Sequence, residues 1–229
     1  MSITLGLDTS TTACSAAVLR GDRIVAARFE IMERGQAERL NPMVGEVMAE
    51  AGLAFADLSL VAVTVGPGAF TGLRIGLACA RAIALAAGVP LAGVTTFGAL
   101  ARAIPESERA GRDILVCVDG KRRDVFVQRF DPALTPRGVP GALDPDAAAA
   151  GLRTGAHLIA GDGAARLREV LEATGDAGDG ATARLRFSRA AAPPDARHVA
   201  ALGRAAGPSP VPPRPFYIRP PDARLPTAS

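Results

Sequence analysis

Apolar and polar positions along the N-terminal half of the chain predict strands first and helices later. Short apolar runs flank a polar turn at residues 8–12, and Gly21-Asp22 is typical of a hairpin leading into a third run. Residues 36–51 carry apolar side chains every three or four positions, which predicts an amphipathic helix. A β-meander followed by β/α alternation predicts an α/β fold with a mixed sheet. The expected strands are residues 3–7, 13–19, 23–29, 60–65 and 91–94, and the expected helices are 36–51 and 70–87.

The second half of the chain repeats this pattern. An apolar strand at 114–118 ends in Asp119, a polar turn follows, and a strand resumes at 125–130, just as the first strand ends in Asp8. The two aspartates lie about half a chain length apart, which predicts a duplicated unit, although strand–Asp–turn–strand is common enough to arise by chance. The remaining pattern predicts a strand at 157–160, helices at 164–173 and 195–205, a loop at 174–183, and an extended or partly disordered tail from Pro208.

Composition indicates a sizeable core and excludes several classes of protein. The 229 residues are 48% hydrophobic with a formal net charge of +3, which excludes whole-chain disorder and permits an anionic partner without requiring one. The three cysteines form no Cys-x-x-Cys pair, so neither a disulfide framework nor a zinc knuckle is expected. The two histidines lack His-x-x-x-His spacing, which argues against a metallopeptidase or any other metal site on a helix.

The same features favour a cytoplasmic protein. Unpaired cysteines fit a reducing compartment, and no basic stretch precedes the first strand, so no signal peptide is expected. The longest apolar stretch, residues 75–89, contains Arg81, whereas a membrane span needs about 20 nearly uncharged residues. We therefore expect no association with a membrane.

Two turns have the composition of an anion site. Asp8, Thr9 and Ser10 combine a carboxylate, two hydroxyls and free backbone N–H groups, which can hold a phosphate with Mg²⁺ beside the carboxylate. The alternative is a turn whose side chains satisfy only the local backbone. The segment Gly161-Asp162-Gly163, between a strand and a helix, could likewise accept a nucleoside or form a plain turn.

A glycine-rich segment, residues 66–76, joins a strand to a helix and has two interpretations. Its N–H groups could bind an anion at the helix start, although the segment is neither a Walker A loop nor a dinucleotide fingerprint. Alternatively, Gly68, Gly72 and Gly76 leave one side of the helix bare for another helix to approach. Since each helical glycine costs up to about 1 kcal/mol relative to alanine, three of them need a compensating contact.

Together, these motifs resemble one bacterial family. The resemblance extends from residue 3 to about residue 219, and residues 66–76 are its most specific part. It implies a two-lobed, actin-like fold, duplicated and ribonuclease-H-like, with lobes at 1–103 and 104–207 and a Pro-rich tail at 208–229. Four segments match the tRNA threonylcarbamoyladenosine biosynthesis proteins of the TsaB (YeaZ) family in order and spacing: Leu5-Gly6-Leu7-Asp8-Thr9-Ser10 followed by Ala13-Cys14-Ser15, residues 66–76, Val118-Asp119 with Asp124-Val125-Phe126, and Pro215-Phe216-Tyr217-Ile218-Arg219.

The resemblance also implies partners. Family members are cytoplasmic and pair with the larger paralogue TsaD, which transfers threonylcarbamoyl to tRNAs that read codons starting with A; the ATPase TsaE joins the pair. TsaD binds metal through a His-x-x-x-His motif that this chain lacks. The resemblance therefore implies a non-catalytic activator without a cofactor of its own, because ATP and metal would belong to the partner subunits. It would meet tRNA only indirectly, and the sequence carries no visible peptidase chemistry.

The family pattern places the partner surface on the two early helices, 36–51 and 70–87, which family members also use for homodimers. It thereby favours the packing interpretation of the glycines. Gln36-Ala37 and Asn41 depart from the family, where His-Ser or His-Thr and Leu are common. The expected seam residues are Leu40, Val44, Val47, Gly68, Thr71, Gly72, Arg74, Ile75 and Ala78.

Two other functions stay open from the sequence. A nucleotide-using ATPase or phosphotransferase would place Asp8 and Asp119 around Mg-ATP, yet Lys121-Arg122-Arg123 replaces the small residues expected beside a phosphate. Direct tRNA binding could use these basic residues, although the chain has few aromatic side chains for base stacking. The candidates for a vestigial phosphate or nucleotide site are Asp8, Thr9, Ser10, Asp119, Gly161 and Gly163.

Overall fold

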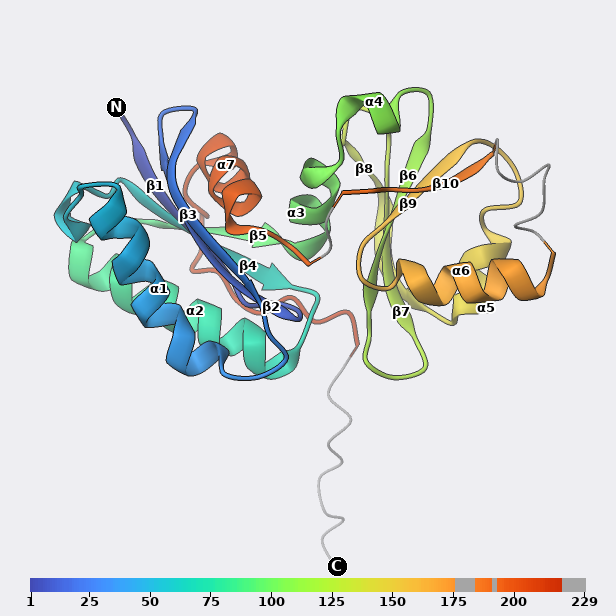
Figure 1. Cartoon of the computed structure of the whole chain (residues 1–229), viewed down its shortest axis with the longest axis horizontal. Coiled ribbons are helices and arrows are strands. Elements are labelled where there is room, and N and C mark those ends of the chain that lie inside the picture. The colour runs from blue at the N-terminus through green and yellow to red at the C-terminus, as the bar shows by residue number, and fades with distance from the viewer. Residues whose placement is uncertain (176–183, 191–192, 220–229) are drawn as a thin grey trace, which may run out of the picture.

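The computed structural model has two lobes side by side, each built around one five-stranded sheet (Figure 1). It describes residues 1–175, 184–190 and 193–219. Most of the expected loop at 174–183 and the last part of the expected tail therefore lie outside the described residues. Within the described chain, both lobes confirm an α/β fold with mixed sheets.

The first sheet contains the expected strands: β1 (Ile3–Asp8), β2 (Ala13–Arg20), β3 (Arg23–Ile31), β4 (Leu60–Gly66) and β5 (Leu91–Thr95). Their order is β3-β2-β1-β4-β5. The first three strands pair antiparallel, whereas β4 pairs parallel with both β1 and β5. The central strands are buried almost throughout, which explains why they are continuous apolar runs in the sequence.

The second sheet consists of β6 (Asp113–Asp119), β7 (Val125–Phe130), β8 (Pro136–Leu143), β9 (His157–Ala160) and β10 (Leu185–Phe187). Its order, β8-β7-β6-β9-β10, repeats the first sheet, and each pair of strands keeps the same direction. This topology confirms the duplicated unit. The sequence pattern missed β8, which is an exposed edge strand containing proline and glycine, and β10, which is three residues long.

Helices of unequal size cover the outer faces of the two sheets. The expected helices α1 (Gln36–Glu50) and α2 (Phe70–Ala87) pack on the first sheet, whereas the shorter α5 (Pro145–Ala150) and α6 (Ala164–Ala173) pack on the second. The apolar stripe of α1 lies against the sheet, as its period predicts. Two short elements, η1 (Phe55–Asp57) and α4 (Glu106–Arg109), complete the connections.

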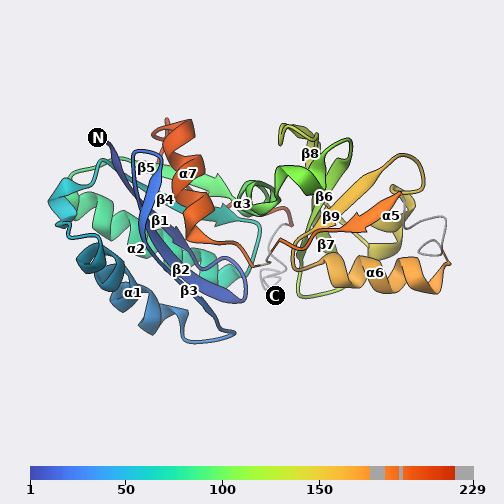
Figure 2. The ribbon, with the colours of Figure 1, turned by 45° about the horizontal axis from the view of Figure 1, so that its top comes forward.

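The inner faces of the sheets are covered by two helices (Figures 1 and 2). Phe97 on α3 (Thr96–Ala103) packs against β6 of the second sheet, and Val199 on α7 (Ala196–Ala206) packs against β4 of the first. A chain division at residue 103 therefore does not follow the packing. The expected lobes at 1–103 and 104–207 are wrong for α7, which buries its apolar side on the first sheet. Helix α3 lies between the lobes, because Phe97 packs with the second sheet and Ala99 with the first.

Close approach fixes α7 on the first sheet. A Cβ on Gly6 would lie 2.4 Å from the carbonyl oxygen of Ala196, so β1 and α7 touch backbone to backbone. At the helix start, Ala196 N donates to the Ser15 hydroxyl at 2.9 Å. Asp195 is the N-cap, as expected, and accepts from Arg197 N at 2.8 Å. The last helix of the chain is thus part of the first lobe's core.

The described part of the tail is packed rather than free. Residues 212–217 form no helix or strand, as expected from their prolines. Pro213 is nevertheless buried, and Phe216 and Ile218 are partly buried against the cluster formed by α3 and the second sheet. The expectation of an extended tail on the surface is confirmed for this part, where several residues are exposed. Its apolar side chains Pro213, Phe216 and Ile218 nevertheless turn inward and anchor it to the protein.

Among the described helices, α2 alone is long and apolar enough, by length and composition, to cross a membrane. The sequence analysis expected no such helix because of its arginines. Leu77 and Ala80 on α2 are buried in the core cluster of the first lobe. Packing on the sheet therefore accounts for the apolar residues on the buried third of this helix.

Candidate functional site

The turn after β1 contains a buried carboxylate. Asp8 has no exposed surface, and its Oδ1 accepts hydrogen bonds from Ser10 N at 3.3 Å, the Ser10 hydroxyl at 2.7 Å and the Thr64 hydroxyl at 2.6 Å. Its Oδ2 has no hydrogen-bond partner among the described residues. Burial raises the pKa of Asp8 to about 6, although the bonds from Ser10 and Thr64 oppose this shift. The carboxyl therefore changes charge near neutral pH.

The glycine-rich segment packs against this turn. A Cβ on Gly72 would lie 2.1 Å from the carbonyl oxygen of Thr9. On Gly68 the same atom would lie 2.1 Å from the carbonyl oxygen of Ser10. On Gly76 it would lie 2.7 Å from Oγ1 of Thr9. Only glycine permits these approaches without displacing backbone or side-chain atoms.

Hydrogen bonds close the same contact. Ala69 N donates to Ser10 O at 2.7 Å, and the Thr9 hydroxyl donates to Gly72 O at 2.7 Å. The contact that compensates for the helical glycines Gly72 and Gly76 is therefore the β1–β2 turn of the same chain, which also contacts Gly68 just before the helix. The interpretation that this bare side admits another helix is wrong, because the turn already fills it.

The matching turn of the second lobe is electrostatically different. Oδ1 of Asp119 accepts from Lys121 N at 3.0 Å, as Asp8 does from Ser10 N. The Asp119 carboxylate also forms ion pairs of 3.2 Å with Lys121 and with Arg166. Burial would raise the pKa of Asp119, but the hydrogen bonds and charge of Lys121, helped by Arg166, lower it below its usual value. At the pH at which Asp8 begins to take up a proton, Asp119 is therefore still ionised.

Gly161 and Gly163 have a packing role beside this turn. Gly161 has a φ of +104°, and a Cβ there would lie 2.1 Å from the carbonyl oxygen of Cys117. On Gly163 a Cβ would lie 2.7 Å from the Cys117 sulfur. Between the glycines, Asp162 accepts a hydrogen bond from Asp119 N at 3.0 Å. The segment thus joins β9 to β6 and forms a plain, closely packed turn.

The expected phosphate ligands fit a nucleotide poorly. The hydroxyls of Thr9 and Ser10 donate to Gly72 O and Asp8, and the Asp119 carboxylate is paired with two cations. Across the described residues, no group of three or more His, Cys, Asp or Glu side chains could hold a metal ion. A cavity of about 410 Å³ does lie beside the turn, with Thr11 and Lys121 in its lining. The hydroxyl of Thr11 is buried there without a hydrogen-bond partner in the described structure.

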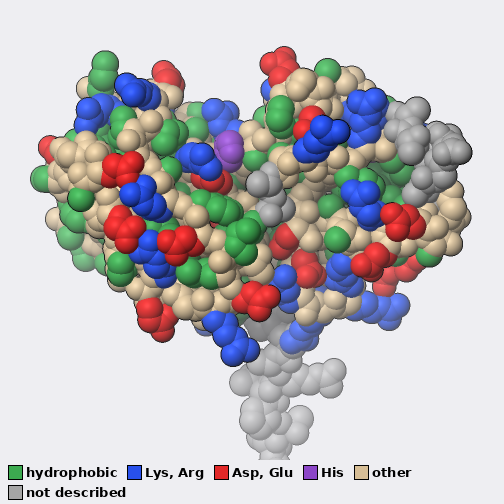
Figure 3. All heavy atoms as spheres, viewed as in Figure 1, with side chains coloured by type: hydrophobic (Ala, Val, Ile, Leu, Met, Phe, Trp, Pro, Cys, Tyr) green, Lys and Arg blue, Asp and Glu red, His purple; other side chains and the backbone are tan. Residues whose placement is uncertain are grey.

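The basic hairpin of the second lobe is engaged within the chain. Lys121 pairs with Asp119, and Arg123 pairs with Asp144 at 2.7 Å. Figure 3 shows acidic and basic side chains interspersed over both lobes on the face in view. These contacts argue against the use of this hairpin as an RNA-binding patch.

The expected seam residues on and next to α1 and α2 fall into two groups, one buried in this chain and one exposed at its surface. Leu40, Val44 and Val47 are at most 2% exposed because they form the stripe that α1 buries on its own sheet. Their assignment to a partner seam is wrong, and the buried Gly72 belongs with them. The seam residues that do reach the surface are Thr71, Arg74 and Ala78, which are exposed, and Gly68 and Ile75, which are partly exposed.

Ala78 was expected at this surface, but the neighbouring small residues Gly45 and Ala82 were not. Exposed Asn41 and Gly45 lie on the side of α1 opposite its buried stripe, and exposed Ala78 and Ala82 lie on α2. The Cys79 thiol donates to Asn41 Oδ1 at 3.1 Å, so the Asn that departs from the family joins the two helices. A helical projection of the non-apolar positions would have found this face.

An aromatic stack at the start of α2 was also missed. The Phe70 and Tyr217 rings lie 5.7 Å apart between centroids with an interplanar angle of 25°. The Arg74 guanidinium lies 3.5 Å from the Phe70 centroid, which is cation–π geometry. Both aromatic side chains remain exposed. The stack brings the tail against the helix that carries the expected seam.

Comparisons with known proteins agree with the fold and the motifs. Residues 29–158, more than half of the chain, match the family model "TsaD: tRNA N6-adenosine threonylcarbamoyltransferase". The tRNA threonylcarbamoyladenosine biosynthesis protein TsaB of Escherichia coli is 37% identical over 122 residues, which cover 53% of this chain and 52% of that protein. The chain thus spans about half the length of this curated relative.

Solved structures extend the likeness to nearly the whole chain. An uncharacterized Pseudomonas aeruginosa protein, described as similar to the peptidase YeaZ, superposes with a TM-score of 0.77 at 28% identity, covering 96% of this chain and 100% of the other. The ROK hexokinase of Thermus thermophilus shares the fold, with a TM-score of 0.51 at 16% identity over 87% of this chain and 97% of its own. The chain therefore belongs to the family that the TsaD model describes and, within it, to the TsaB/YeaZ proteins with a sugar-kinase- and actin-like fold.

Proposed function

We propose that this protein takes part in the biosynthesis of threonylcarbamoyladenosine in tRNA, as a non-catalytic subunit that binds and activates the transferase TsaD. Its family membership supports the pathway, since relatives carry that name. The outward face of α1 and α2 supports the mode of action and is the observation that carries the proposal. ATP and metal would belong to the partner subunits, TsaE would join the complex, and tRNA would be met only through it. We place the complex in the cytoplasm.

The α1–α2 face has the properties of a helix-docking surface. It is formed by the two longest helices of the described chain, and small exposed residues recur along both of them. Small side chains let the backbone of a second helix pair approach closely, as in a four-helix bundle. The same face would form homodimers when the transferase is absent. We define it by its exposed small residues Ala37, Asn41, Gly45, Thr71, Ala78 and Ala82.

Replacing Ala78 by Glu tests the proposal. A glutamate in the middle of this face would be buried without a partner in the complex, which costs several kcal/mol. We expect Ala78→Glu to abolish co-purification with TsaD from the same organism. Ala165→Glu, the same change at an exposed position of α6, is the matched control and should bind as the wild type does. Normal binding by Ala78→Glu would refute the docking face.

A second candidate function is nucleotide binding by this chain alone. The cavity beside the Asp8 turn favours it, because the polar residues Thr11 and Lys121 are both in its lining. Calorimetric titration of the isolated chain with Mg-ATP tests this alternative. Tight binding that is lost in both Asp8→Ala and Lys121→Ala would support it, whereas the primary proposal expects no measurable heat.

A further inference from the structure

The C-terminal segment 209–219, here called the strap, begins on the edge of the first sheet. Ser209 N donates to Leu91 O at 2.8 Å, and Gly93 N donates to the Ser209 hydroxyl at 3.0 Å. Further along, Phe216 N donates to Val65 O at 2.7 Å. These bonds attach the strap to β5 and β4, so its path over the first lobe is defined by backbone contacts.

Two contacts tie the strap to α2. Arg81 donates to Pro213 O at 2.6 Å, and Tyr217 stacks on Phe70. Four extended residue steps span about 13 Å, and the eleven helical steps from residue 70 to residue 81 span about 16 Å. These two lengths are similar, so the strap can follow the helix between the two contacts. Because the later strap residue, Tyr217, meets the earlier helix residue, Phe70, the strap runs antiparallel to α2 and reaches its first turn.

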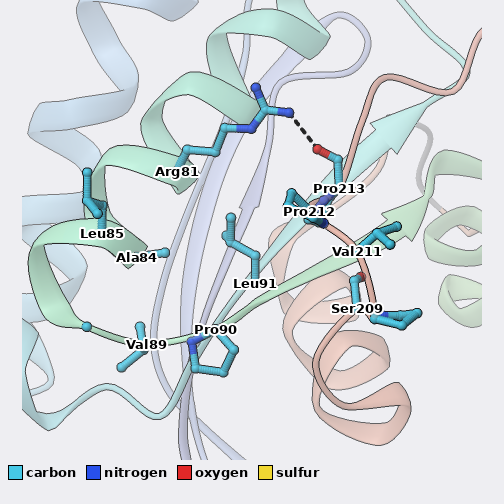
Figure 4. Close-up of a pocket in the computed structure, with 12 residues that line it drawn as sticks. Arg81, Ala84, Leu85, Val89, Pro90, Leu91, Ser209, Val211, Pro212 and Pro213 are labelled. Carbon is cyan, nitrogen blue, oxygen red and sulfur yellow. Dashed lines mark hydrogen bonds between the residues drawn. The ribbon is translucent and has the colours of Figure 1, made fainter.

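Between these contacts and the end of the helix the strap does not rest on α2. Figure 4 shows Arg81 pointing to Pro213, with Leu85 and Val211 on opposite sides of an open groove. The groove has a volume of about 610 Å³. Because burial does not join the two elements there, the few anchoring contacts determine where the strap lies.

The far end of the strap belongs to the second lobe. Phe216 and Ile218 pack against the cluster that contains Val116 and Val118 of β6. Arg219 forms an ion pair of 2.5 Å with Asp124, and both side chains are no more than 30% exposed. One short segment therefore contacts the second sheet and the first turn of α2 within three residues, Tyr217 to Arg219.

We propose that the strap sets the position of the first turn of α2 according to the position of the second lobe, and thereby regulates docking at the α1–α2 face. Tyr217 and Arg219 are its positioning residues: Tyr217 contacts α2, and Arg219 acts through Tyr217 from the second lobe. The regulatory part rests on the proposed function. The mechanical part does not, because it concerns the free chain.

Hydrogen exchange on the free, full-length chain tests the mechanical part. Arg219→Gln and Asp124→Asn should each speed exchange of the first-turn amides of α2 about three- to fivefold, since each removes the ion pair that fixes the end of the strap next to Tyr217 on the other lobe. Arg204→Gln, which removes the ion pair of α7 with Asp22, is the matched control and should leave these amides unchanged. Unchanged first-turn exchange in both Arg219→Gln and Asp124→Asn would overturn the coupling.

Calorimetry with purified TsaD from the same organism tests the regulatory part. Tyr217→Ala should weaken binding about tenfold, whereas Tyr217→Phe, which keeps the stack, should stay within about twofold of the wild type. Wild-type affinity in Tyr217→Ala, in a sample whose first-turn exchange has risen, would overturn the regulation. A wild-type chain that binds no transferase would refute the proposed function instead, and the exchange result would still decide the coupling.

Discussion

The two lobes share one strand order but differ in what surrounds it. The outer helices have 15 and 18 residues in the first lobe and 6 and 10 in the second. A longer amphipathic helix buries its apolar stripe and still presents several turns outward. Duplication thus kept the sheet, which carries the core, while the helical layer grew into a broad outer face in one lobe only.

The aspartates at the ends of β1 and β6 differ in the same way. Both accept a bond from the N–H group two residues on, yet Asp8 is fully buried among hydroxyls whereas Asp119 sits beside two cations. The pKa of Asp8 is raised by burial and that of Asp119 is lowered by its hydrogen bonds and ion pairs. The same turn therefore holds a buried carboxyl group that can become neutral in the first lobe and an ion-paired carboxylate near the surface in the second.

The largest expected effect is the loss of folding stability when a substitution disrupts the packing of the first-lobe turn. Gly72→Ala places a Cβ 2.1 Å from Thr9 O, and the overpacking should destabilise the fold by at least about 3 kcal/mol. Denaturant unfolding followed by circular dichroism measures the loss. Gly45→Ala, on the solvent side of α1 with open space around it, is the control and should gain about 0.5–1 kcal/mol. Equal stability of the two variants would contradict the packing role.

A smaller effect distinguishes the two aspartates by pH. The folded pKa of Asp8, about 6, lies above its ordinary value of 3.8. Its protonated form therefore favours folding below about pH 4, and this contribution is lost as pH rises through about 6. Asp8→Asn should accordingly stabilise the fold by about 3 kcal/mol at pH 8 and by almost nothing at pH 4. Thermal unfolding at both values checks this, and a gain that is independent of pH would contradict it.

The smallest expected effect is the change in folding stability caused by neutralising Asp119 in the second lobe. Its sign is opposite to that expected for Asp8. The pKa of Asp119 is lowered, so its contribution to folding is present above its usual value and is lost as pH falls through the folded pKa. Because the carboxylate is partly exposed and screened, Asp119→Asn should destabilise the fold by less than about 1 kcal/mol at pH 7. Chemical unfolding at pH 7 and near pH 3 measures it. If Asp119→Asn instead stabilises the fold at pH 7, the cost of burying the charge outweighs its ion pairs in the second turn as well, and the contrast between the two aspartates is wrong.

Much of the fold could be predicted because its signals are local. The stripe from Leu40 to Met48 predicts α1, and the repeat of an apolar strand ending in aspartate predicts the duplication. The candidate site was less predictable. The same stripe was assigned to a partner, because a period identifies the apolar side of a helix without identifying what covers it.

The sequence by itself determined the strands, the long helices and the repetition of one unit, since period, turn residues and apolar runs act over a few positions. Tertiary structure alone decided that Thr9 meets Gly72, that α7 returns to the first sheet, and that Arg219 reaches Asp124. Thr9 and Gly72 are 63 residues apart, and Asp124 and Arg219 are 95 apart. Such contacts depend on how whole sheets and helices pack, so no local pattern along the chain encodes them.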